Sequence, residues 1–83
     1  MNQVTQVLDG FVYVSDKKAL KLEVIAAGLI LPCYLYGEQE QALIELYQSH
    51  QFDIEDIIES MVEKSETNID GEIWLSAATV MSN

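Results

Sequence analysis

Apolar residues between positions 54 and 62 recur with the spacing i, i+3, i+4, i+7 and i+8, which places them on one face of an α-helix. Asp53 precedes them where a helix N-cap is expected, and Asp56 stands in the capping-box position three residues later. The pattern therefore predicts an amphipathic helix over residues 53–66.

A second helical stripe lies just upstream, where apolar residues occupy positions 42, 43, 46 and 47. Glu38 and Glu40 stand in the first turn of this segment, where negative charge is favourable because the helix dipole is positive at its N-terminus. We expect a helix over 38–50, a short break at 51–52, and a helical hairpin formed with the next helix.

The two ends of the chain share a different pattern. Asp9-Gly10 and Asp70-Gly71 are each followed, one residue later, by a β-branched, an aromatic and an aliphatic residue in turn. Asp-Gly favours a turn with positive φ, and the residues after it favour a strand. The sequence therefore predicts a short strand at each end, and we expect the two strands to pair as neighbours.

Residues 16–28 fit two conformations. Ser15 or Asp16 is suited to cap a helix that Gly28 would end, whereas the alternation of apolar and charged residues over 20–24 is typical of a half-buried strand. We expect a helix over 16–28; the alternative is a β-meander over 11–36 followed by two helices and a strand.

These elements predict one α+β domain over residues 1–83. Its small antiparallel sheet, made from the N- and C-terminal strands, is expected to pack on the helical hairpin of 38–50 and 53–66, with the helix over 16–28 as an addition. A chain of this length has room for a single hydrophobic core.

Residues 29–36 form an apolar run that ends at Gly37. Pro32 argues against a helix interior or a central strand, because proline lacks the backbone N–H that both require. We expect an edge strand, extended core filler or an interface. At an interface, Leu31, Tyr34 and Tyr36 would bury against a second copy of the chain, since tyrosine combines an apolar body with a polar tip.

Charge is distributed unevenly along the chain, whose formal net charge is −10. Residues 1–37 carry three acids and three lysines, whereas residues 38–72 carry eleven acids and only Lys64. Binding to nucleic acid or to an anionic membrane surface requires clustered Lys and Arg. Neither is therefore expected as a direct partner of this chain.

The acids of the last predicted helix fall on its outer side. Glu55, Glu59 and Glu63 are spaced i, i+4, i+8, and Asp56 and Glu66 lie beside them. Like charges at this spacing destabilise a helix by about 0.2–0.5 kcal/mol per pair. Two interpretations stand side by side: a face that serves solubility, and a face that docks a basic protein. Carboxylates about 6 Å apart along a helix resemble a row of phosphates.

Candidate chemistry is sparse. Cys33 and His50 are the only cysteine and histidine, and nothing in the pattern orients them as a nucleophile and its base. The acids match no EF-hand loop. We expect no catalytic residue, no metal site and no cofactor, and so no enzyme. A small chain without a disulfide, a secretory signal or a long apolar segment indicates a cytoplasmic protein and no membrane anchor.

The expected function is a small protein-binding or inhibitory module that docks a basic partner through the acidic helical face. Toxin-immunity and anti-defence proteins of bacteria or their mobile elements, some of which would act as nucleic-acid mimics, fit this profile. The alternative is a self-associating structural or accessory subunit, a homo-oligomer without catalytic activity.

Overall fold

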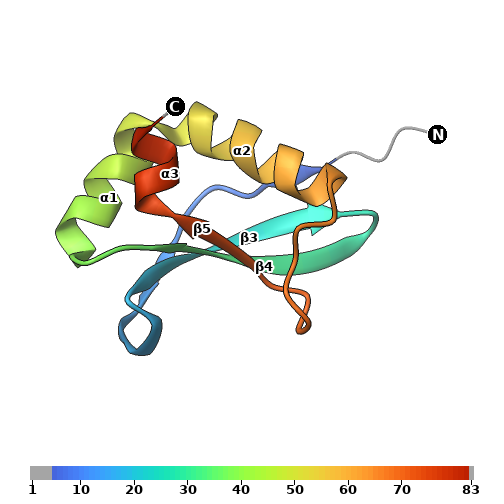
Figure 1. Cartoon of the computed structure of the whole chain (residues 1–83), viewed down its shortest axis with the longest axis horizontal. Helices are drawn as coiled ribbons and strands as arrows, with labels where there is room; N and C mark the ends of the chain where they lie inside the picture. Colours follow the sequence, from blue (N-terminus) through green and yellow to red (C-terminus); the bar gives the residue numbers. More distant parts are fainter. Residues whose placement is uncertain (1–4, 83) are drawn as a thin grey trace.

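The structure, a computed structural model, describes residues 5–82 and shows an α+β fold (Figure 1). The described elements are, in chain order, β1 (Gln6–Val7), β2 (Val12–Val14), the 3-10 turn η1 (Ser15–Lys17), β3 (Ala19–Ala26), β4 (Leu29–Tyr36), α1 (Glu40–Ser49), α2 (Gln51–Glu63), β5 (Ile73–Ser76) and α3 (Ala77–Met81). The predicted fold class is therefore confirmed. No helix in this part of the chain has the length and apolar composition needed to span a bilayer.

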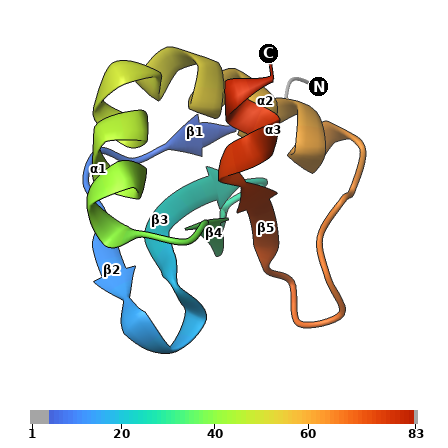
Figure 2. The ribbon, with the colours of Figure 1, turned by 60° about the vertical axis from the view of Figure 1, so that its left-hand side comes forward.

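The elements form two layers, a five-stranded sheet and a layer of helices that covers one of its faces (Figures 1 and 2). The strand order is β1-β3-β4-β5, and β2 pairs with β3 beside β1. All these pairs are antiparallel except β4 and β5, which are parallel. The parallel pair arises because the chain crosses the sheet through α1 and α2 before it returns as β5.

This topology corrects two expectations about the sheet. The sheet is mixed rather than antiparallel, and the strands at the two ends of the chain do not pair, because β3 and β4 lie between β2 and β5. The repeated Asp-Gly does form turns with positive φ at glycine, with φ of 103° at Gly10 and 78° at Gly71.

The helix expected over 16–28 is wrong, and the alternative β-meander is correct. Only η1 is helical, and it is followed by the eight-residue strand β3. The alternation of side chains decides the outcome, because it buries Leu20, Leu22 and Val24 completely on the helix-covered side of the sheet. Gly28 closes the β3–β4 hairpin instead of ending a helix.

Pro32 lies inside a strand that has neighbours on both sides, which corrects the expectation of an edge strand. It pairs with Glu23 of β3, but β5 pairs only with residues 33–36 of β4. Backbone groups of alternate residues point to opposite sides of a strand, and the N–H of Gly37 donates to the carbonyl of Lys18 in the chain that forms β3. The backbone N–H groups of the even-numbered residues of β4 therefore point towards β5. Pro32 lacks this N–H, but it precedes Cys33, the first residue of β4 that pairs with β5, so no hydrogen bond of that pairing is lost.

The helical hairpin is present with shifted boundaries. The break is a single residue, His50, and α2 begins at Gln51, so Asp53 lies in its first turn and is not its N-cap. Glu66 lies beyond the last residue of α2. The short helix α3 was not expected; the hydroxyl of Ser76 caps it by accepting the N–H of Ala78 at 3.2 Å.

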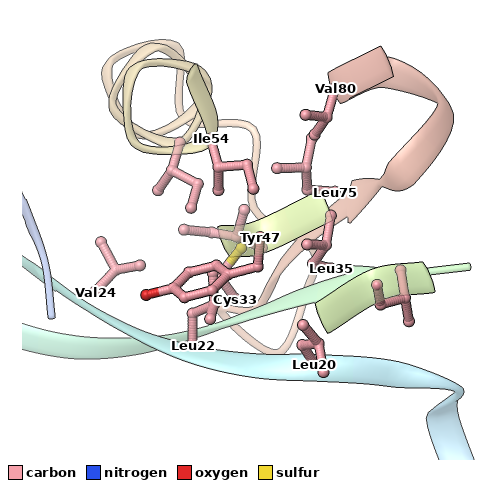
Figure 3. Packing of buried hydrophobic residues seen from close by; sticks show 12 residues of the cluster. Leu20, Leu22, Val24, Cys33, Leu35, Tyr47, Ile54, Leu75 and Val80 are labelled. Carbon is pink, nitrogen blue, oxygen red and sulfur yellow. The ribbon is translucent and has the colours of Figure 1, made fainter. Parts of the chain in front are cut away.

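The core lies between the two layers (Figure 3). Leu22 and Cys33 on the sheet and Ile54 on α2 have no exposed surface, and Tyr47 on α1 is buried among them. Burying one large aliphatic side chain contributes about 1.5–3 kcal/mol. The Tyr47 hydroxyl also accepts the N–H of Gly10 at 3.3 Å, which ties the first Asp-Gly turn to the helical layer.

Candidate protein-binding surface

α2 has one apolar side and one acidic side. Ile54 and Ile58 are fully buried against the sheet. The opposite side carries four carboxylates, which we call the acidic ridge: Glu55, Asp56, Glu59 and Glu63. All of them are exposed except Glu55, which is half-buried. The packing of the apolar stripe thus turns the expected acidic face outward.

Two grooves flank the acidic ridge. Glu55 and Glu59 border a groove between α2 and the segment 5–10. Asp56 borders a second groove on the other side, between α2 and the β5–α3 segment, and Glu66 lines it from the loop after the helix. The structure therefore places Glu66 beside the ridge, although it does not lie on the same helix.

The acidic ridge has no cationic partner among residues 5–82. The single contact between a basic side chain and a carboxylate in this part of the chain joins His50 Nδ1 to Asp53 Oδ2 at 3.4 Å, at the N-terminal end of α2. The Gln51 amide donates to Asp9 at 3.0 Å and to Glu55 at 3.4 Å, but it carries no charge. No lysine of the described chain therefore forms an ion pair with a ridge carboxylate, although Lys64 lines the same groove as Asp56 and Glu66.

Phe52 is a feature that the sequence interpretation missed. It belongs to α2, three residues before Glu55 and four before Asp56, and its side chain is 82% exposed. Residues three and four apart share a helix face, so this aromatic ring stands at the N-terminal end of the acidic ridge. The expected break at 51–52 hid this relation, because a helix that starts at 53 excludes Phe52 from the face.

The three residues expected to mediate self-association separate onto two sides of the sheet. Leu31 packs against the core, whereas Tyr34 and Tyr36 lie on the side away from the helices. Tyr34 is buried against Trp74, with 4.8 Å between ring centroids, and Tyr36 is 39% exposed. Lys17 covers this aromatic cluster, with its Nζ 5.3 Å from the centre of the Tyr34 ring.

Glu72 completes the cluster from the loop before β5. Its carboxylate accepts hydrogen bonds from Asn68 Nδ2 at 3.0 Å and from Trp74 Nε1 at 3.1 Å. These bonds, with a smaller contribution from the charge of Lys17, lower the pKa of Glu72 below its usual value.

Cys33 and His50 lie in different environments. Cys33 lies in the core with no exposed surface, and burial raises the pKa of its thiol to about 12, so the reactive thiolate is absent near neutral pH. His50 is exposed at the surface, where it pairs with Asp53. Within residues 5–82, no three His, Cys, Asp or Glu side chains converge as metal ligands.

Comparison with known proteins identifies relatives of the fold. No curated protein sequence matches this chain. The crystal structure of a protein of unknown function from Shewanella loihica PV-4 superposes with a TM-score of 0.76 at 23% sequence identity, over 90% of this chain and 94% of the other. That likeness supports the small two-layer fold, and the other protein is described as a member of the DUF1488 family. A model of the same family, described as a protein of unknown function, matches residues 9–75, and the chain therefore belongs to the DUF1488 family.

Proposed function

We propose that this protein is a binding module that docks a basic protein through the acidic ridge of α2. The observation that carries the proposal is the row of carboxylates without a cationic partner in the described chain. A helix can tolerate such repulsion at modest cost, but it gains nothing from it on its own. A basic partner would supply the missing positive charge on contact.

The geometry of the acidic ridge supports an electrostatic role. Residues four apart on a helix are separated by about 6 Å along its axis, so Glu55, Glu59 and Glu63 present a regular line of negative charge. Such a line attracts a Lys- or Arg-rich surface and raises the association rate. Where that surface normally binds nucleic acid, the ridge would block it as a phosphate mimic, as immunity or anti-defence proteins would.

Phe52 adds an apolar contact to the proposed interface, which the charges of the acidic ridge do not provide. Exposed aromatic side chains that become buried on contact often carry a large share of the binding energy at protein interfaces. The ring stands beside the groove between α2 and the segment 5–10, so it can enter an apolar pocket of the partner while the ridge contacts its cations. The proposed interface therefore combines one aromatic anchor with a charged rim.

The test compares two triple variants that change the net charge equally. The ridge variant is Glu55→Lys, Glu59→Lys and Glu63→Lys; the matched control on the other helix is Glu38→Lys, Glu40→Lys and Glu45→Lys. The probe is a synthetic Arg- and Lys-rich peptide, with its affinity measured by calorimetry in dilute and in physiological salt. We expect the ridge variant to bind at least ten-fold more weakly than the control.

One outcome would refute the proposal. An equal loss of affinity in both triple variants would mean that the peptide responds to net charge alone, and the ridge proposal would be abandoned. The variant Phe52→Ala leaves the charge unchanged, and we expect it to weaken binding several-fold to a partner protein that contacts the ridge. Circular dichroism confirms that each variant is folded before its affinity is compared.

A second candidate function is a self-associating structural or accessory subunit. It is favoured by one observation, the sheet face that no described helix covers (Figure 1). Dilution experiments on the unmodified chain test this role, since a subunit that acts through self-association must remain associated at micromolar concentration.

A further inference from the structure

The sheet has one face that the described helices leave uncovered, which we call the open face (Figures 1 and 2). The alternation of side chains along the strands, together with the strand register, determines which residues lie on it. Across the sheet they form four rows: Val14, Ala19, Tyr36 and Ser76; Val12, Lys21, Tyr34 and Trp74; Glu23 and Pro32; and Gln6, Ile25 and Ile30.

The open face exposes apolar side chains. Val12 is 65% exposed on β2, and Ile30 is 64% exposed at the start of β4. Tyr36 adds a partly exposed aromatic ring at the other end of β4. Exposed apolar side chains on a small domain often mark an interaction site. Here they are divided, because Lys21 and Glu23 lie between Val12 and Ile30 in the strand register.

The charges on the open face are balanced, unlike those on the acidic ridge. Lys21 and Glu23 are adjacent on the open side of the central strand β3, and both are exposed. Within residues 5–82 neither takes part in an ion pair. Beside them, Lys17 and Glu72 flank Trp74 as a second pair of opposite charges. Equal numbers of opposite charges favour a partner that also carries both signs.

We infer that the open face binds a second copy of this chain around a two-fold axis, with Lys21 of each copy meeting Glu23 of the other. In a two-fold interface the same patch contacts itself, so each residue i that contacts residue j has its equivalent contact from j to i. The neighbouring opposite charges of β3 are self-complementary under this operation. Val12 and Ile30 of the two copies would then be buried on either side of the paired charges.

Other occupants fit the open face less well. Nucleic acid requires a surplus of cations over acids, and the open face has no such surplus. The acidic ridge of another copy would meet Glu23 as well as Lys21, so half of that contact would be repulsive. A copy of the open face itself satisfies both charges. The dimer would leave the helical layer of each copy on the outside, with both acidic ridges free.

The test reverses the charge at position 21 in one variant and at position 23 in another. We expect Lys21→Glu and Glu23→Lys, each alone, to weaken dimerisation at least ten-fold in sedimentation velocity across a dilution series from 1 to 100 μM. An equimolar mixture of the two single variants should associate again, because one chain then offers two acids and the other two lysines. Matched charge changes away from the face, Lys64→Glu and Glu45→Lys, should leave the dimer dissociation constant unchanged within two-fold.

The mixture separates contact between copies from effects within one copy. A local change in a single chain cannot be rescued by adding a different chain, so restored association in the mixture supports the two-fold contact. A monomeric unmodified chain at 100 μM, or single variants that dimerise as the unmodified chain does, would overturn the inference. It is independent of the ridge proposal, since the Lys21→Glu and Glu23→Lys variants keep the ridge and should still bind the basic peptide.

Discussion

The turn between β3 and β4 provides a sharp test of the fold. Ala27 and Gly28 are its two central residues, with φ of 52° and 80°. Positive φ at both positions is the geometry of the two-residue hairpin turn that matches the twist of paired strands. It is unfavourable for alanine, because the left-handed region brings Cβ close to the following carbonyl oxygen and costs about 1–2 kcal/mol.

Replacing Ala27 by glycine removes this cost. The substitution also gives the unfolded chain more freedom, which opposes the gain by about 0.4–1 kcal/mol. We therefore expect Ala27→Gly to raise the free energy of unfolding by about 0.5–1 kcal/mol. The reverse change, Gly28→Ala, should lower it by a similar amount. An added Cβ at Gly28 meets no atom within 4 Å, so its effect is purely conformational.

The assay is urea unfolding followed by the fluorescence of Trp74, the single tryptophan. In small proteins the free energy of unfolding falls by about 1–3 kcal/mol per M of urea, so a change of 1 kcal/mol shifts the urea midpoint by about 0.3–1 M, which is easily resolved. If residues 16–28 were helical, glycine at position 27 would instead destabilise by about 0.5–1 kcal/mol. Destabilisation by Ala27→Gly, or unchanged stability in Gly28→Ala, would therefore refute the hairpin.

Two further predictions concern pH. Burial raises the pKa of the Cys33 thiol from 9.0 to about 12, so between these values the unfolded chain releases a proton that the folded chain keeps, and stability falls as pH rises. Urea unfolding at pH 8, 9 and 10 should show a decline that is shallower in Cys33→Ala, by up to about 1.4 kcal/mol per pH unit; equal slopes would contradict the buried thiol. The hydrogen bonds from Asn68 and Trp74 lower the pKa of Glu72 from 4.5, so the stability that they add is present above this pH and is lost below it. Thermal melts from pH 7 to pH 3 should show a smaller acid-induced loss in Glu72→Gln, and identical acid profiles would argue against these bonds.

The sequence predicted the elements whose signals are local. The apolar spacing of 54–62 identified α2 to within three residues at either end, because that pattern repeats over several turns. The helix predicted over 16–28 was wrong because it rested on possible capping residues at the two ends of the segment. The observed strand β3 is stabilised by pairing with strands on both of its sides. α3 has five residues and was too short to show a periodic pattern.

The candidate surfaces were predicted in part. The acidic ridge could be read from the spacing of its glutamates, since a helix places residues four apart on one face. Phe52 was lost to an error of two residues in the start of the helix. Leu31 and Tyr34 were grouped together, although positions an odd number apart in a strand point to opposite sides of the sheet.

By itself the sequence determined the α+β class, the two long helices and the confinement of net negative charge to residues 38–72. These follow from periodicity and composition, which act over a few residues at a time. Only the tertiary structure decided that β3 is a strand, that β5 joins the sheet in parallel beside β4, and that one face of the sheet stays open. The strand β3 depends on pairing with its neighbours β2 and β4, which the alternation over 20–24 allows but does not require. The parallel position of β5 and the open face depend on packing between segments far apart in the chain, which no local pattern specifies.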